Sequence, residues 1–264
     1  MRGATCPCMV AVMSTHTINS ARLEDSDLWA RAFAALYDPL LWVAERVGMR
    51  AHREQLLRHA RGVTLELGSG TGLNLPHYPD DVDELILTEP DPAMRTRLEK
   101  RLGRSGRSAR VLDAPAERLP FADGSIDTVV STLVLCTVPE PDRALREVSR
   151  VLRPDGQLLF LEHVRSESPA LASWQDRLVE PWRRFAAGCR CNRATVELIK
   201  ACELELDRLR AASWQGMPPI IRPLVAGRAR PKVQTPVDVS RGPAADLSAD
   251  AVFTARNARA ATVP

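Results

Sequence analysis

Long apolar runs, zinc-type cysteine spacing and concentrated charge of one sign are all missing from this 264-residue sequence. No apolar stretch approaches the roughly 18 residues that a membrane-spanning helix needs, so we predict no transmembrane segment. The six cysteines form no CxxC pair, and the histidines complete no zinc pattern around them. We therefore predict no metal and no disulfide framework, as in a cytosolic protein with reduced thiols.

Positive charge is scattered rather than clustered. The net charge is only +3, and Lys and Arg are interspersed with Asp and Glu, so nucleic acid is not a predicted partner. The densest basic group is Arg183, Arg184, Arg190 and Arg193. It would suit an acidic ligand or peripheral membrane contact, although a solvated helix face is the plainer interpretation. We predict a cytoplasmic protein that acts on a small molecule.

The centre of the chain alternates short apolar runs with helical patterns. The strands are expected at residues 63–67, 84–88, 109–112, 126–131 and 157–162, and helices near 91–103, 140–152, 170–187 and 193–202. Such alternation predicts an α/β fold, a Rossmann-like, doubly wound, mostly parallel sheet. Two further strands, at 204–209 and 220–226, bring the sheet to seven and are predicted to form an antiparallel hairpin at its edge.

Both ends of the chain differ from this centre. We predict a flexible N-terminal segment over residues 1–26, a main domain over 27–230 and a disordered C-terminal tail over 231–264, which has no apolar periodicity. Helical spacing after an N-cap at Ser26 or Asp27 predicts a lid or packing helix, bent at Pro39.

The most informative segment is Glu66–Asn74, which reads ELGSGTGLN and follows a buried strand. Its alternating glycines let the backbone turn sharply and approach a ligand closely. No lysine follows the last glycine as in a P-loop, and Leu73 stands where a dinucleotide loop has Gly or Ala. Glu66 favours a cation over a pyrophosphate, and S-adenosylmethionine has an α-ammonium group and no phosphate. We predict that this cofactor is bound by Glu66, Gly68, Ser69, Gly70, Thr71, Gly72 and Asn74.

An acidic residue, Glu89, ends the second expected strand. A carboxylate about 20 residues beyond the loop is placed to accept hydrogen bonds from both ribose hydroxyls. A capping carboxylate is the alternative, but Asp91 is the better N-cap and leaves Glu89 free. Pro90 and Met94 are expected to complete this part of the cofactor site.

Two further segments carry a resemblance to a known family. Residues 116–127 read AERLPFADGSID, and residues 146–164 read REVSRVLRPDGQLLFLEHV. With the glycine loop and Glu89, in this order, residues 27–230 resemble the class I, type 11 S-adenosylmethionine-dependent methyltransferases. The resemblance implies that Ala116 and Glu117 border the adenine, and that Ser131, Thr132 and Leu133 pass under the methionyl group. Where this chain has Pro115, many relatives have an Asp that accepts a hydrogen bond from the adenine N6 amino group. Asp113 or a backbone carbonyl must therefore supply that acceptor in this chain.

Residues 132–138, 162–164 and 188–189 resemble one branch of that superfamily, which contains the alkyl-thiol S-methyltransferases. That branch has an N-terminal hydrophobic membrane anchor, which we do not find in this sequence. The resemblance implies methyl transfer to a small hydrophobic acceptor such as a thiol. A quinone-ring carbon and a phospholipid amino group stay open as acceptors, and so does a non-catalytic, cofactor-binding interaction protein.

The chemistry itself needs little from the protein, because the sulfonium already makes the methyl group electrophilic and displacement needs mainly alignment. A thiol acceptor would gain from a nearby base or cation. Glu162 and His163 follow the fifth strand and are the candidate catalytic residues, although His163 could simply be hydrogen-bonded in its loop. Tyr37 could face the sulfonium and Trp182 could line an apolar pocket, or both could pack in the core. Cys136 is interpreted as a buried, inert thiol.

Overall fold

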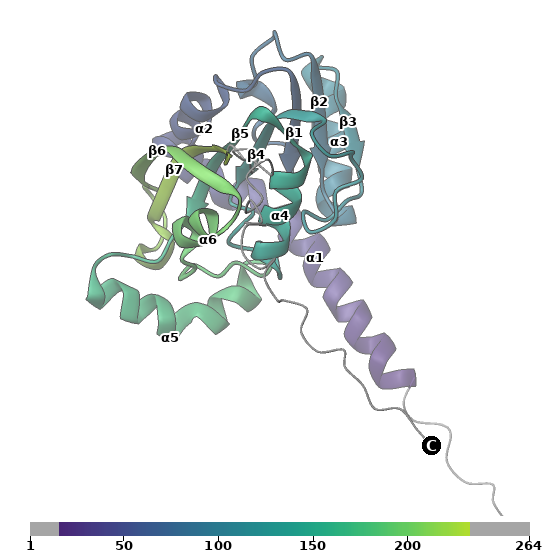
Figure 1. Ribbon diagram of the computed structural model, residues 1–264. Helices are drawn as coiled ribbons and strands as arrows, with labels where there is room; N and C mark the ends of the chain where they lie inside the picture. The colour runs from purple at the N-terminus through teal and green to yellow at the C-terminus, as the bar shows by residue number, and fades with distance from the viewer. Residues whose placement is uncertain (1–15, 233–264) are drawn as a thin grey trace, which may run out of the picture. The chain divides into compact units, whose positions relative to one another are not determined.

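A single mixed sheet organises residues 16–232, which the computed structural model describes (Figure 1). Its strand order is β3-β2-β1-β4-β5-β7-β6. The strands are β1 (Val63–Leu67), β2 (Glu84–Thr88), β3 (Arg110–Leu112), β4 (Ile126–Thr132), β5 (Leu152–His163), β6 (Leu204–Ser213) and β7 (Pro223–Pro231). The helices are α1 (His16–Ala44), α2 (Arg50–Leu57), α3 (Pro92–Ser105), α4 (Pro141–Val151), α5 (Pro169–Phe185) and α6 (Thr195–Ala201), with short helical turns η1 (Glu45–Met49), η2 (Leu75–His77) and η3 (Pro219–Ile221).

Strands β1 to β5 are parallel, and β7 runs antiparallel to both β5 and β6. The predicted fold and its antiparallel edge hairpin are therefore confirmed. Strands β1 and β2 have the predicted bounds. Strand β6 continues past its predicted end to Ser213. Strand β7 begins at Pro223, three residues after its predicted start, because residues 219–221 form η3, and it continues to Pro231. Each strand supplies the other with backbone partners that local hydrophobicity does not reveal.

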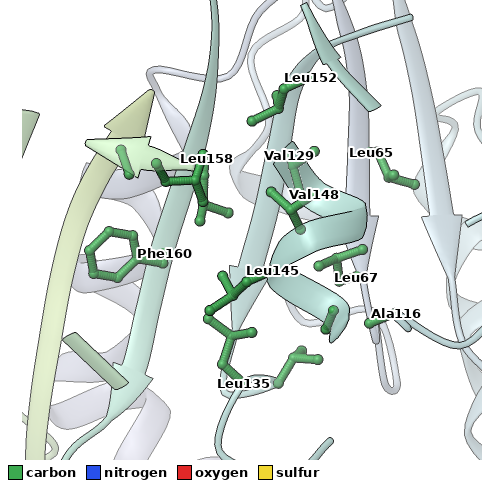
Figure 2. Packing of buried hydrophobic residues seen from close by; sticks show 14 of the residues in the cluster. Leu65, Leu67, Ala116, Val129, Leu135, Leu145, Val148, Leu152, Leu158 and Phe160 are labelled. Atoms are coloured by element: carbon green, nitrogen blue, oxygen red, sulfur yellow. The ribbon is translucent and has the colours of Figure 1, made fainter. Parts of the chain in front are cut away.

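Two hydrophobic clusters pack on opposite faces of the sheet, and successive strand residues alternate between them. Val129 belongs to one cluster and Val130 to the other. On the first face, Leu145 and Val148 of α4 pack beside Val129 (Figure 2). The second face is covered by apolar side chains of α1, α2 and α3. Glu66 also lies toward this second face, since it alternates with Leu65 and Leu67 of the first cluster.

The N-terminal helix departs from the prediction. It begins at His16, ten residues before the predicted N-cap, and continues through Pro39 to Ala44. Residues 16–25 contain neither Gly nor Pro and include good helix formers, so their polar composition is compatible with a helix and does not require flexibility. The helical chain is interrupted instead at Gly48, inside η1, and the sequence analysis did not predict α2. Residues 1–15, and the predicted tail from residue 233 onward, lie outside the described residues.

Within the described range, we find no helix that combines the length and the apolarity needed to cross a membrane.

Candidate functional site

The glycine loop leaves β1 at the carboxyl edge of the sheet. Gly68, Gly70 and Gly72 have φ angles of 50°, 58° and 84°, a region that other residues rarely adopt. A Cβ atom on Gly72 would lie 2.8 Å from Cδ1 of Leu98, and one on Gly68 would lie 3.0 Å from Cγ2 of Val134. A Cβ atom on Gly70 would meet no atom within 4 Å. Gly68 and Gly72 thus permit close packing, whereas Gly70 presents bare backbone to open space where a ligand can approach.

Glu89 is buried beside this loop, but it is not free as we predicted. Its Oε2 atom accepts a hydrogen bond from the Gly70 amide at 2.7 Å, and Oε1 accepts one from the Asp91 amide at 2.9 Å. Asp91 is the N-cap of α3 as expected, accepting from the amides of Ala93 and Met94 at 2.8 Å each. Burial raises the pKa of Glu89, and its two amide partners oppose this. Since each carboxylate oxygen has a second lone pair, Glu89 can tie β2 to the loop and still accept from a ligand.

Glu66 sits under the loop in a buried hydrogen-bond network. Its carboxylate accepts from Nδ2 of Asn74 at 2.8 Å and from the Tyr78 hydroxyl at 2.7 Å. Arg53 of α2, itself buried, donates to Oδ1 of Asn74 at 2.8 Å. Burial raises the pKa of Glu66 to about 7, although both hydrogen bonds lower it. The site therefore holds a carboxylate that a cation would help to ionise. Sequence analysis missed Arg53 and Tyr78, since no motif marks them.

Helix α1 closes over the loop through Asp38, which the sequence analysis also missed. The Thr71 hydroxyl donates to Oδ1 of Asp38 at 2.6 Å, and Arg101 of α3 forms an ion pair with the same carboxylate. The neighbouring Tyr37 packs against Phe33, with ring centroids 5.6 Å apart. Burial raises the pKa of Tyr37 to about 12, so its phenol keeps its proton at neutral pH. The predicted lid helix is thus latched to the glycine loop.

The segment predicted to border the adenine lies along the same edge. Ala116 is buried, and Oε1 of Glu117 accepts from the Glu140 amide at 3.4 Å. Asp113 forms an ion pair with Arg95 at 3.0 Å, and its side chain is 64% exposed. Asp113 and a backbone carbonyl both stay open as the acceptor that Pro115 cannot supply, since a carboxylate paired with Arg95 still has free lone pairs. Pro90 is exposed, whereas Met94 is buried at the start of α3.

Glu162 holds the loop that follows β4. Its Oε1 atom accepts from Oγ of Ser131 at 2.7 Å and from the amides of Val134 and Leu135 at 3.0 and 3.1 Å. Its Oε2 atom accepts from the Cys136 amide at 3.3 Å. This arrangement suits a positioning residue, because the carboxylate of this candidate catalytic residue already has four donors. Within the same loop, Leu133 has a left-handed φ of 60°, and Oγ1 of Thr132 accepts from Asn74 Nδ2 at 3.1 Å.

His163 lies at the end of β5, buried against Trp214 with ring centroids 5.5 Å apart. Burial lowers the pKa of His163 to about 4, although the nearby backbone of Pro223 and Ile221 raises it. The imidazole is therefore neutral at pH 7 and a weak proton acceptor. Its Nδ1 atom is buried without a hydrogen-bond partner among residues 28–232.

Two thiols face this imidazole. Cys136 and Cys189 are both buried, their Sγ atoms are 3.8 Å apart, and one ring nitrogen of His163 lies within 4.8 Å of both. Burial of Cys136 matches its interpretation as a buried thiol. The cluster itself had no signal in the sequence, because its members come from β5 and from loops after β4 and α5.

Aromatic side chains connect α1 with α5. Trp29 lies 6.1 Å from Phe185, and Trp182 lies 5.7 Å from Phe185, measured between ring centroids. The indole nitrogen of Trp182 is buried without a partner among residues 28–232. Trp29 and Phe185 are 45% and 51% exposed, so they form an accessible apolar surface.

The chain is similar in sequence and fold to known proteins. A family model described as a methyltransferase domain matches residues 65–160. The chain is 36% identical over 175 residues to the thiol S-methyltransferase TMT1B of Homo sapiens, covering 61% of this chain and 71% of that protein. It is 37% identical over 173 residues to TMT1A of the same organism, another thiol S-methyltransferase, covering 62% and 69%. A geranyl diphosphate methyltransferase solved in complex with SAM matches 69% of this chain and 84% of its own, with TM-score 0.54 and 15% identity, which supports the fold alone.

Proposed function

Since the chain belongs to the class I S-adenosylmethionine-dependent methyltransferases, we propose that it transfers the methyl group of this cofactor to a small, apolar thiol. The choice of a thiol acceptor rests on the sequence identity of this chain, above one third, to proteins named thiol S-methyltransferases. The apolar surface formed by Trp29, Trp182 and Phe185 supports a hydrophobic acceptor over a charged one.

The residues of the loop fit the cofactor. Gly70 leaves open space where a Cβ atom would otherwise stand, and Oγ of Ser69 is buried without a partner among residues 28–232. We propose that Glu66 and its network provide the negative environment for the α-ammonium group, and that Glu89 accepts hydrogen bonds from the ribose hydroxyls. When bound, the cofactor supplies an electrophilic methyl group on a sulfonium.

The remaining residues align the reactants and exclude water. We propose that the latch between Asp38 and Thr71 keeps α1 over the cofactor, and that Tyr37 places its neutral ring beside the sulfonium. Glu162 fixes the loop after β4, under the methionyl group. His163 is a poor general base because its pKa is far below neutral, so a proton-accepting role for it is not part of this proposal.

The test compares a small alkyl thiol with the amine of the same chain length, using purified protein and methyl-labelled cofactor. We expect methylation of the thiol, with a rate that rises with pH as thiolate accumulates. A Glu89→Gln variant, deficient in cofactor binding, controls for contaminating activity. Methylation of an aminophospholipid or a quinone precursor, with none of any thiol, would overturn the choice of acceptor and leave the family assignment standing.

A further inference from the structure

The cluster of Cys136, His163 and Cys189 has the composition of a metal site. The three potential ligand atoms lie within 4.8 Å of one another, and all three residues are buried. Two thiols and an imidazole are a donor set that zinc binds strongly. The Nδ1 atom of His163 is buried without a hydrogen-bond partner among residues 28–232, so this nitrogen is available as a ligand.

The spacing of the sulfur atoms fits a tetrahedral ion. With zinc–sulfur bonds of about 2.3 Å, two thiolates of a tetrahedral site lie about 3.8 Å apart. The Sγ atoms of Cys136 and Cys189 are 3.8 Å apart. A disulfide would need them to approach to about 2.05 Å. An ion could therefore enter between the sulfur atoms without changing their separation.

The surrounding backbone holds the two cysteine loops in register. The Arg190 amide donates to the Cys136 carbonyl at 2.8 Å, and Nη1 of Arg193 donates to the carbonyls of Leu135 and Val138. Glu162 holds the Cys136 amide from the other side. The imidazole ring stacks on Trp214, with ring centroids 5.5 Å apart, and this contact restricts its orientation. These contacts pre-organise the three ligands before an ion binds.

We propose that Cys136, His163 and Cys189 bind one zinc ion, and that the acceptor thiol occupies its fourth coordination position as a thiolate. The second part rests on the proposed function. Three protein ligands and one open position are the pattern of catalytic zinc sites. Two thiolates neutralise the charge of Zn²⁺, which makes its burial acceptable. This proposal replaces our expectation of no metal, which came from cysteine spacing along the chain alone.

The ion would supply the cation that a thiol acceptor needs. The incoming thiol loses its proton to solvent as it binds, because coordination deprotonates a thiol. Its sulfur then forms a bond to the methyl carbon, while the bond between that carbon and the sulfonium breaks with both electrons going to the cofactor sulfur. The products are a methyl thioether and S-adenosylhomocysteine.

Metal binding is tested without reference to activity. The wild-type full-length protein is purified under reducing conditions, its zinc content is measured, and the metal-free protein is then titrated with Zn²⁺ and with Co²⁺. We expect equimolar binding and a thiolate-to-cobalt charge-transfer band with visible bands of tetrahedral Co²⁺. Cys136→Ser and Cys189→Ser should weaken zinc binding by on the order of 100-fold or more. Cys202→Ser is the matched control, a buried cysteine outside the cluster, and should bind zinc as the wild type does.

Three results separate the parts of this proposal. Absence of the charge-transfer band in the wild type, or a Cys136–Cys189 disulfide in the freshly purified protein, would overturn the metal site whether or not the variants fold. If the thiol occupies the fourth coordination position, an alkyl thiol should shift the Co²⁺ absorption bands and the alcohol of equal length should not. Unshifted bands would overturn the proposal that the acceptor thiol binds the metal. Thiol methylation by protein proven free of metal would overturn the zinc role while leaving the proposed function intact.

Discussion

Replacing Glu89 by glutamine tests its proposed role in cofactor binding with little change of side-chain shape. Two backbone amides, of Gly70 and Asp91, donate to its carboxylate at 2.7 and 2.9 Å. A glutamine has one accepting oxygen, so its NH₂ group must face one of these donors. The variant therefore loses a hydrogen bond within the protein as well as the charged acceptor that we assign to the ribose.

Both losses have an expected magnitude. A hydrogen bond to a charged group contributes ~1.5–3 kcal/mol, so cofactor affinity should fall by about 10- to 150-fold. The unpaired amide should lower the free energy of unfolding by ~1–3 kcal/mol. Calorimetry gives the first value and chemical denaturation the second.

Asp91→Ala is the matched control, because it removes the N-cap side chain of α3 and keeps the backbone amide that donates to Glu89. It should destabilise the fold by ~0.5–2 kcal/mol and leave cofactor affinity within about twofold of the wild type. If folded Glu89→Gln binds the cofactor as tightly as the wild type, the ribose assignment is wrong. If both variants lose affinity equally, Glu89 acts only through the stability of the loop.

Three further predictions concern the loop and its lid. Burial raises the pKa of Glu66 from 4.5 to about 7, so protonation of its side chain stabilises the cofactor-free fold below pH 4.5, and this stabilisation is lost as the pH rises through 7. In denaturation experiments at pH 8, Glu66→Gln should therefore be more stable than the wild type by up to ~3 kcal/mol. Gly70→Ala and Gly106→Ala both place a Cβ atom in open space at positive φ, and each should lower the free energy of unfolding by ~1 kcal/mol. Calorimetry should show at least about tenfold weaker cofactor binding for Gly70→Ala alone. Equal affinities of the two variants would show that no ligand approaches Gly70. Asp38→Asn weakens a partly exposed latch, so stopped-flow measurements should show cofactor release faster by up to about fivefold, and an unchanged rate would mean that α1 does not gate the site.

Local sequence determined the fold and the cofactor loop. Apolar runs with the right length and order predicted β1 to β5, since a strand buried on both faces needs a continuous apolar segment. Glycines at alternate positions predicted the loop, because few other residues tolerate its positive φ angles. The N-cap Asp91 was predicted as well, since capping depends on residues within one helical turn. Cysteine spacing did not reveal the cluster of Cys136, His163 and Cys189, because spacing rules describe ligands that are close in sequence.

Tertiary structure decided the features that depend on distant partners. Helix α2 is short and mostly polar, and what holds its Arg53 in the site is the buried contact with Asn74, 21 residues away. Asp38 became a latch only when α1 packed over the loop, and Glu162 became a positioning residue only because the chain after β4 turns back over it. Cys136 and Cys189 are separated by 53 residues. Parallel strands bring their carboxyl ends to one edge of the sheet. The packing of distant segments at this edge, which no single segment predicts, places both thiols beside His163.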